Sequence, residues 1–318
     1  MIVTLTLNPA IDQTLVLQKF VRGDTLRVKS SRFDPGGKGI NVSRVIHELG
    51  GESIAMGFAA GGLGRYLEQS LDAMGIETDF VYTQGETRTN IAILEETSHS
   101  TTILSAAGPT TEPEAVTEIR RRLRERLREG DWLVIAGSIP PPLTGSVYNE
   151  IIHEVIEMGV HTVLDADRGP LEEGTAAHPQ IVKGNRREFE RLVGRTLDDE
   201  ESTLAAAVEV HKSGVPIVLT TRGRHGAIAV FEGGRVVRGV APKVRAVSAV
   251  GSGDAFLAGV VLTLMRGGTM EEAMRLGIAA GTAAVLTAGT ELCHRREVDI
   301  LLPRVRVETQ AEPVGSRN

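Results

Sequence analysis

The chain has 318 residues, of which 41% are hydrophobic, 24% are charged and only 3% are aromatic, and it contains 36 glycines. This composition excludes a disordered or fibrous chain and predicts a core of aliphatic side chains, which suits a buried parallel sheet covered by helices. The net charge of −6 argues against a general nucleic-acid binder, although a few side chains and backbone amides could still form a local anion site.

The chain carries no signal for a disulfide, a zinc site or a membrane segment. Its one cysteine, Cys293, cannot form an internal disulfide, and its eight histidines show no zinc-binding spacing. No stretch approaches the roughly 18 consecutive apolar residues that span a bilayer. The apolar start of the chain breaks at Asn8-Pro9, which predicts a first strand rather than a leader. We therefore expect a cytoplasmic protein.

The first third of the chain predicts a mixture of strands and one helix. Two β-prone stretches within residues 14–33 predict a hairpin, and a glycine-rich loop at 34–39 leads into a helix that ends at Gly50-Gly51. Strand-like runs return between residues 80 and 105. We expect these runs to join the hairpin in a small second sheet.

From residue 111 onward, the pattern predicts alternating strands and helices. A capping-box pattern at Thr111–Glu114 predicts the start of an arginine-rich helix, and a second one at Thr269 predicts another helix. Such alternation is typical of a doubly wound sheet. The predicted strands are 132–137, 161–167, 181–185, 216–221 and 243–247, with helices at 145–158 and 201–213 and a hairpin at 227–239.

Val250-Gly251-Ser252-Gly253-Asp254 lies where a polar turn becomes an apolar helix. Backbone amides left unpaired at a helix start, together with the helix dipole, favour an anion. Two glycines would let a phosphate approach the backbone, and Asp254 could accept a proton in the first turn. A plain helix cap with an acidic residue is an equally good interpretation of these five residues.

The loop at residues 35–41 predicts a second helix start, with Lys38 as a mobile cation and Asn41 in the first turn. A tight turn is the simpler alternative. A nucleotide P-loop requires Ser or Thr after its lysine, where this chain has Gly39, and neither glycine loop has the dinucleotide-binding pattern.

Two further positions could bind a ligand. Arg88 lies on a predicted strand and could bind phosphate through its guanidinium, although an arginine on a strand is more often a solvated edge charge. Asn185 and Glu188 follow a strand, and Glu188 could hold a hydrated Mg²⁺. A helix cap is at least as good an interpretation of Asn185.

Taken together, seven segments resemble the PfkB (ribokinase-like) carbohydrate kinase family, in the family's order and over nearly the whole chain. Within the family, the chain looks most like the branch of phosphofructokinases and tagatose-6-phosphate kinases. The segments are NPAID (8–12), PGGKGINVSR (35–44), GETRTN (85–90), AGSIPPP (136–142), VKGNRREF (182–189), TRGRHGA (221–227) and AVGSGDAFLAG (249–259).

The resemblance implies a ribokinase-like α/β fold with three α/β/α layers, a mainly parallel central sheet and a small β-sheet lid. It assigns residues 1–12, 34–82 and 107–310 to the kinase core, 13–33 and 83–106 to the lid, and 311–318 to a tail. It also implies ATP and Mg²⁺ as cofactors, and a homodimer formed through the lid, with no nucleic-acid or membrane partner. Dependence on K⁺, at the loops flanking 248–254 and 284–291, is left open.

The resemblance also assigns roles to individual residues. Asp254 would be the catalytic base, with Gly251, Ser252 and Gly253 around the transferred phosphoryl group. The sugar hydroxyls would contact Asp12, Gly37, Asn41, Ser138 and Asp165, and the phosphate already on the substrate would contact Lys38 and Arg88. The ATP site would contain Lys183, Asn185, Thr221, Gly223, Gly226 and Ser248, with Glu188 positioning Mg²⁺.

The implied activity is ATP-dependent phosphorylation of a phosphorylated ketohexose, with fructose 6-phosphate or fructose 1-phosphate converted to fructose 1,6-bisphosphate. Tagatose-6-phosphate kinase, a kinase of an unphosphorylated sugar or nucleoside, and a non-catalytic sensor are the alternatives. The chain departs from the branch pattern at Gly184, at 165–169 and at Thr25, so the sugar itself stays open. The Gly-Ser-Gly-Asp run argues against a sensor, which needs no base.

Overall fold

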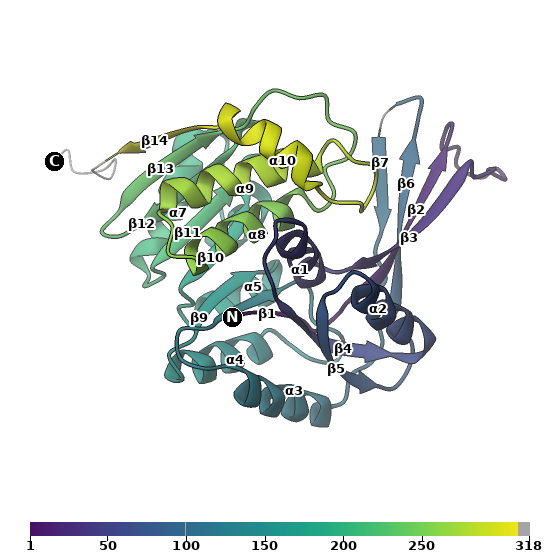
Figure 1. The fold of residues 1–318 in the computed structure, drawn as a ribbon, viewed down its shortest axis with the longest axis horizontal. Coiled ribbons are helices and arrows are strands. Elements are labelled where there is room, and N and C mark those ends of the chain that lie inside the picture. The colour runs from purple at the N-terminus through teal and green to yellow at the C-terminus, as the bar shows by residue number, and fades with distance from the viewer. Residues whose placement is uncertain (99, 311–318) are drawn as a thin grey trace.

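The structure is a computed structural model that describes residues 1–98 and 100–310, so the predicted tail at 311–318 lies outside the described residues. A large sheet runs through the middle of the molecule with helices on both of its faces, and a smaller sheet projects from one end (Figure 1). The predicted three-layer α/β/α architecture with a small separate sheet is therefore confirmed.

Within the described residues, the large sheet has ten strands in the order β14-β13-β12-β11-β10-β9-β8-β1-β4-β5. The pairs from β5 to β11 are parallel, and those from β11 to β14 are antiparallel. The strands are β1 (Ile2–Thr6), β4 (Ile54–Ala60), β5 (Glu77–Thr83), β8 (Trp132–Ala136), β9 (His161–Asp165), β10 (Ile181–Asn185), β11 (Ile217–Thr221), β12 (Ala227–Phe231), β13 (Arg235–Val240) and β14 (Arg306–Gln310).

Two aliphatic cores lie on the two faces of this sheet. One packs against α1, α8, α9 and α10, and the other against α3, α4, α6 and α7. Successive side chains of a strand point to opposite faces, so both faces of each central strand are apolar. The helices are α1 (Lys38–Glu48), α2 (Gly61–Ala73), α3 (Pro113–Arg126), α4 (Ser146–Glu157), α5 (Arg168–Thr175), α6 (Arg186–Val193), α7 (Glu200–Lys212), α8 (Ser252–Met265), α9 (Met270–Ala284) and α10 (Arg295–Leu301), with short 3₁₀ turns η1 (Gly223–His225) and η2 (Leu302–Arg304).

The small sheet, called the lid below, has the order β3-β2-β6-β7 within the described residues. Its strands are β2 (Ala10–Leu17), β3 (Ser30–Gly36), β6 (Arg88–Glu95) and β7 (Ser100–Leu104). Strand pairing places Asp12 beside Asp34 and Asn90, so these three polar residues share one face, called the inner face. Phe33 and Leu104 lie on the other, outer face.

Three predictions about local structure were wrong. Residues 80–82 lie in β5, at the edge of the large sheet, and do not join the lid. Residues 243–247 form no strand. The predicted capping box at 111–114 does not form, because Pro113 takes the first helical position and Glu112 becomes the N-cap without a side-chain hydrogen bond. The predicted capping box at Thr269 is confirmed.

The parallel order places the carboxyl ends of β1, β9, β10 and β11 along the same edge of the sheet. Ligands of open α/β sheets bind at this edge. The lid and the starts of α1 and α8 flank it, which brings together the two glycine loops of the sequence (Figure 1). No helix among the described residues has the length and apolar character needed to cross a bilayer.

Candidate active site

Two of the helices that begin at this edge of the sheet, α1 and α8, start directly after a glycine with a positive φ. Gly37 is the N-cap of α1 with a φ of 111°, and Gly251 is the N-cap of α8 with a φ of 73°. Other residues rarely adopt these angles. A Cβ atom at Gly251 would also lie 2.3 Å from Leu292 Cδ2. Both helix starts therefore depend on glycine and leave backbone amides free to face an anion.

Asp254, in the first turn of α8, is the point where the two helix starts meet. Its side chain is buried, and its Oδ2 accepts a 2.8 Å hydrogen bond from Asn41 Nδ2 of α1. Burial, reinforced by the like charge of Asp165, raises the pKa of Asp254 to about 6, although Lys183, Lys38 and Asn41 oppose the shift. A carboxylate with this pKa is suited to accept a proton near neutral pH.

A cluster of four charged side chains, called the buried cluster below, lies beside Asp254. Three of them are buried and the fourth, Lys38, is partly buried. Asp165 has no exposed surface and accepts 2.7 Å hydrogen bonds from Lys38 Nζ and Lys183 Nζ. Lys38 Nζ also donates to Glu188 Oε1 at 3.1 Å. Burial alone would raise the pKa of Asp165, but the two ammonium groups hold it below its ordinary value.

Lys183 places its positive charge beside the start of α8. Its side chain is buried, and its Nζ would lie 2.9 Å from a Cβ atom built on Gly253. The predicted anion-binding turn at 251–254 therefore has a buried ammonium group beside it, in addition to its backbone amides. An ammonium group and a helix start both favour a negative charge at the same point.

Asn185 and Glu188 form a capping box at the start of α6. Asn185 Oδ1 accepts a hydrogen bond from the Glu188 backbone amide, and Glu188 Oε2 accepts one of 2.7 Å from the Asn185 amide. The helix-cap interpretation of Asn185 is thus confirmed. No group of three or more potential protein ligands for a metal occurs in the described part of the chain.

A cavity of about 670 Å³ opens on the other side of the α8 start. Its volume lies in the range that holds small-molecule ligands. Thr221, Gly223 and Gly226 line it, as do Ser252 and Gly253. Three other residues predicted for the ATP site, Lys183, Asn185 and Ser248, do not line this cavity.

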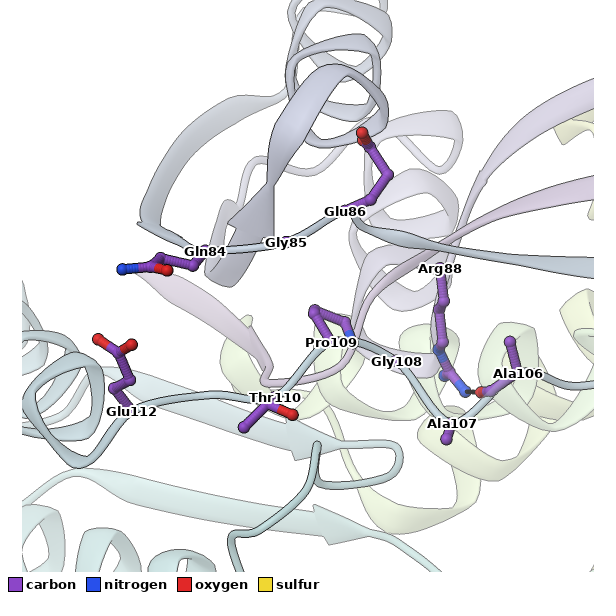
Figure 2. A pocket seen from close by; sticks show the side chains of 10 residues that line it. All are labelled: Gln84, Gly85, Glu86, Arg88, Ala106, Ala107, Gly108, Pro109, Thr110 and Glu112. Atoms are coloured by element: carbon purple, nitrogen blue, oxygen red, sulfur yellow. Dashed lines mark hydrogen bonds between the residues drawn. The ribbon is translucent and has the colours of Figure 1, made fainter.

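On the lid side, Asp12, Asn90 and Arg88 lie on the inner face. Asn90 Nδ2 donates a 2.8 Å hydrogen bond to Asp12 Oδ1, and burial raises the pKa of Asp12. Arg88 donates to the carbonyl oxygens of Asn8 and Ala106, at 2.8 and 2.7 Å. Figure 2 shows Arg88 at the wall of a second cavity, of about 570 Å³, between the β5–β6 and β7–α3 connections.

Lys38 and Arg88, which the resemblance assigns to the same substrate phosphate, have different partners in this structure. Lys38 is bound to Asp165 and Glu188 on the α8 side, whereas Arg88 lies at the base of the lid beside Ser138, 3.4 Å from its Oγ. Asp165 contacts two lysines and has no exposed surface in this structure, so its predicted contact with a sugar hydroxyl would require a neighbouring group to move.

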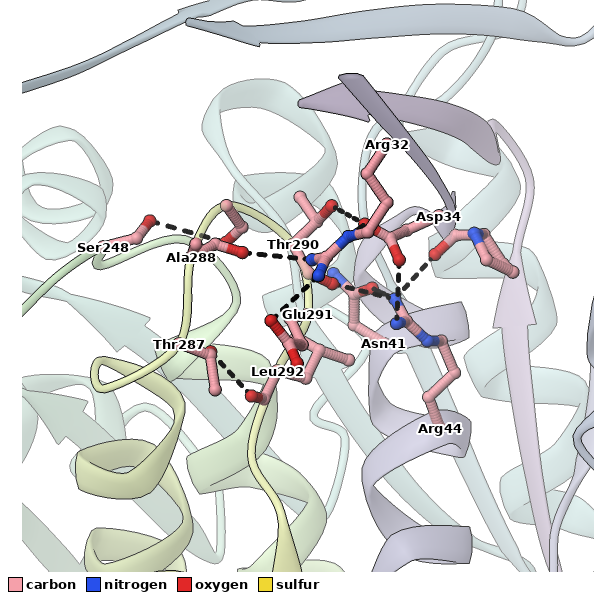
Figure 3. Close-up of polar contacts among 12 residues, drawn as sticks. Arg32, Asp34, Asn41, Arg44, Ser248, Thr287, Ala288, Thr290, Glu291 and Leu292 are labelled. Carbon is pink, nitrogen blue, oxygen red and sulfur yellow. Dashed lines mark hydrogen bonds and ion pairs between the residues drawn. The ribbon is translucent and has the colours of Figure 1, made fainter. Parts of the chain in front are cut away.

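Several polar residues in the site or next to it were not identified from the sequence. Asn90 is the last residue of the GETRTN segment. It lies two residues after Arg88 in a strand, so the two side chains point to the same face, and its place on the inner face could have been predicted. Arg32, Asp34 and Arg44 carried no signal, because their partners Thr290 and Glu291 lie about 250 residues away in the chain. Figure 3 shows this group of contacts between the lid, α1 and the loop after α9.

The fold and site together define a class of enzyme. Two glycine-capped helix starts, a buried ammonium group and one carboxylate with a raised pKa suit the transfer of an anionic group to a hydroxyl. The model of the pfkB family of carbohydrate kinases matches residues 5–296.

Individual relatives agree with this match. The chain is 35% identical to a 1-phosphofructokinase of Borreliella burgdorferi, covering 97% of this chain and 98% of the relative. It is 32% identical to a tagatose-6-phosphate kinase of Staphylococcus epidermidis, covering 96% and 99%. The crystal structure of phosphofructokinase-2 from Escherichia coli with substrates and products superposes with a TM-score of 0.91 at 30% identity, covering 95% and 98%. The chain belongs to the pfkB family of carbohydrate kinases and is a phosphotransferase that acts on an alcohol group.

Proposed function

We propose that the protein transfers a phosphoryl group from ATP to a phosphorylated ketohexose, converting fructose 6-phosphate or fructose 1-phosphate to fructose 1,6-bisphosphate. The observation that carries this proposal is the position of Asp254, which lies between the two helix starts and beside the 670 Å³ cavity. The named relatives of this chain include both a phosphofructokinase and a tagatose-6-phosphate kinase, so tagatose 6-phosphate is the second candidate substrate.

In the proposed reaction, Asp254 accepts the proton of the sugar hydroxyl while that oxygen attacks the γ-phosphorus of ATP. The bond from this phosphorus to the bridging oxygen of the β-phosphate breaks, and ADP leaves. The amides at the start of α8 and the Lys183 ammonium group face the transferred group, where negative charge is redistributed. Phosphoryl transfer passes through a loose transition state, so most of the catalysis comes from positioning and charge stabilisation. The buried cluster supplies both without depending on mobile surface side chains.

The lid contributes the sugar side of the proposed site. Asp12 and Asn90 present hydrogen-bonding groups on the inner face, and Arg88 offers a cation for the phosphate already on the substrate. Gly37, Asn41 and Ser138 lie at the same edge, and Ser138 Oγ already accepts a hydrogen bond from Asn8. Lys38 donates to Asp165 and Glu188, which leaves the third proton of its ammonium group to contact a substrate phosphate.

The 670 Å³ cavity is the proposed ATP site, with Thr221, Gly223 and Gly226 on its wall. Mg²⁺ would arrive with ATP and neutralise charge on its phosphates. Both oxygens of Glu188 already accept hydrogen bonds, which fits contact with a hydrated ion through water better than direct ligation. K⁺ dependence is left open here as it was from the sequence. The two loops at which K⁺ would bind lie side by side, with a 2.7 Å hydrogen bond from Val247 N to Val285 O.

Coupled assays with fructose 6-phosphate, fructose 1-phosphate and tagatose 6-phosphate test this function, with unphosphorylated fructose as the matched control. We expect ATP-dependent turnover of at least one sugar phosphate and a far lower kcat/KM for fructose. Turnover of none of the three sugar phosphates would contradict the proposal. A kcat/KM for fructose equal to that for the phosphates would instead favour a kinase of an unphosphorylated sugar.

We also infer that two copies associate through the lid. Phe33 and Leu104 lie on its outer face with 49% and 52% of their surface exposed, next to the partly buried Ile91. An apolar sheet face beside open strand edges is typical of a surface that a partner covers. Sedimentation of the purified protein tests this inference, and a monomer at micromolar concentration would contradict it.

A further inference from the structure

Arg44, on α1 one turn beyond Asn41, is mostly enclosed, and no carboxylate among the described residues accepts a hydrogen bond from it. Its side chain is 9% exposed, and the one carboxylate within 4 Å among the described residues is Asp34, 3.8 Å away. Burial lowers the pKa of Arg44. A buried guanidinium without a tight ion pair is costly for folding. Its contacts therefore call for an explanation beyond simple stabilisation.

The Arg44 guanidinium joins three separate segments. Its Nη1 donates to Pro35 O of the lid strand β3 at 2.8 Å and to Thr290 O of the loop after α9 at 3.2 Å. The same nitrogen lies 3.4 Å from Asn41 Oδ1 in α1. Figure 3 shows Arg44 pointing into this junction, with Asn41 and Thr290 beside it.

The Asn41 amide lies between Arg44 and Asp254. A guanidinium has donors but no acceptor, so only the amide oxygen of Asn41 can face it favourably. This orientation leaves the amide nitrogen to donate to Asp254 Oδ2 at 2.8 Å. With the amide reversed, its oxygen would face the carboxylate and its NH₂ would face the guanidinium, which is repulsive on both sides.

We propose that Arg44 is a positioning residue for phosphoryl transfer. It fixes the Asn41 amide so that Asn41 holds Oδ2 of Asp254 and leaves Oδ1 to accept the hydroxyl proton. The 3.4 Å contact is long for a hydrogen bond, so Arg44 selects an orientation rather than forming a strong bond. This inference rests on the proposed function, because it assigns Asp254 the role of base.

A double-mutant cycle tests the proposal by measuring kcat for the wild type, Arg44→Lys, Asn41→Ala and the double variant. Lysine keeps the charge of Arg44 but loses the planar arrangement of its donors. We expect Arg44→Lys to lower kcat about 30-fold, because a displaced reacting group is slow to react. We expect the same substitution to cost less than about threefold when Asn41 is already alanine.

Arg32→Ala is the matched control. Arg32 bonds to Asp34 and, through its Nη2, to Ala288 O of the same loop at 3.1 Å, but it does not touch Asn41. We expect its kcat to stay within about threefold of the wild type. A loss as large as that of Arg44→Lys would show that anchoring of the loop sets the rate, and would overturn the proposal.

Equal losses from Arg44→Lys in both Asn41 backgrounds would likewise overturn the proposal, since Arg44 would then act independently of Asn41. If Arg44→Lys fails to fold, Arg44→Gln replaces it in the same cycle, with thermal unfolding as the check on both. A wild type without turnover of any sugar phosphate contradicts the proposed function itself. A wild type that turns over while the cycle is additive contradicts the role of Arg44 alone.

Discussion

The buried cluster around Asp254 and the inner face of the lid differ in how their charged groups are held. Asp165, Lys183 and Asp254 are buried, belong to β9, β10 and α8, and contact charged or amide groups of other elements. Arg88, on the lid, is only partly buried, and its donors meet backbone carbonyl oxygens. The core therefore holds its charges in one arrangement, whereas Arg88 of the lid is held by contacts that a ligand can exchange.

This difference indicates a division of labour. A buried ion cluster cannot be rehydrated when one member is removed, so the chemical step should be sensitive to every member. Groups at a movable lid affect mainly which substrate binds and how well. Substitutions in the core should therefore lower mainly kcat, whereas substitutions in the lid should change mainly KM.

The largest effect is expected in the core. Asp254→Asn removes the proposed base but keeps its size and its place between the helix starts. We expect kcat to fall about 1000-fold, within the range for the loss of a general base, with the KM for ATP little changed. Steady-state kinetics check this, and a kcat within tenfold of the wild type would show that Asp254 is not the base.

Removal of a lid cation should have the next largest effect, on the sugar phosphate alone. We expect Arg88→Ala to lower kcat/KM for the sugar phosphate about 100-fold, because a charge-assisted contact with phosphate is lost. Arg32→Ala is the control, since Arg32 also lies on the lid but bonds to Asp34 and Glu291. Equal effects of the two substitutions would remove the special role of Arg88.

The pH dependence of kcat/KM should reflect the ionisation of Asp254 in the core. Because the raised pKa of Asp254 keeps this group protonated up to about pH 6, kcat/KM should fall as the pH falls through that value. Below it, we expect about a tenfold loss per pH unit. Asn41→Ala removes a hydrogen bond that lowers the pKa of Asp254, so the acidic limb of the pH profile should move to higher pH. No shift in that variant would assign the limb to another group, such as Asp12, whose pKa is also raised.

The smallest effect on the single chain is expected on the outer face of the lid. Leu104→Asp should change thermal stability little, since the side chain is 52% exposed, but should weaken self-association about tenfold. Ile103→Asp is the matched control, because Ile103 is 50% exposed and lies on the opposite face of the same strand. Analytical ultracentrifugation distinguishes them, and equal dissociation constants would exclude the outer face as the interface.

Local patterns predicted most of the architecture. The alternation of aliphatic strands with helices gave the layered fold, and the glycine loops at 35–39 and 251–253 were correctly placed at helix starts. These features depend on neighbours within a few residues, so the sequence carries them directly. The errors at 111–114 and 243–247 were also local, and at Pro113 the fixed φ of proline decided the helix start.

The sequence by itself determined the fold class, the family resemblance and the two helix starts that can face an anion. Only the tertiary structure decided which charges meet: Asp165 bonds to Lys38 and Lys183, 127 and 18 residues away, and Asn41 bonds to Asp254, 213 residues away. It also gave Lys38 and Arg88 different partners. The physical reason is that burial and pairing of charge depend on how strands and helices stack in space, and no periodicity along the chain records that arrangement.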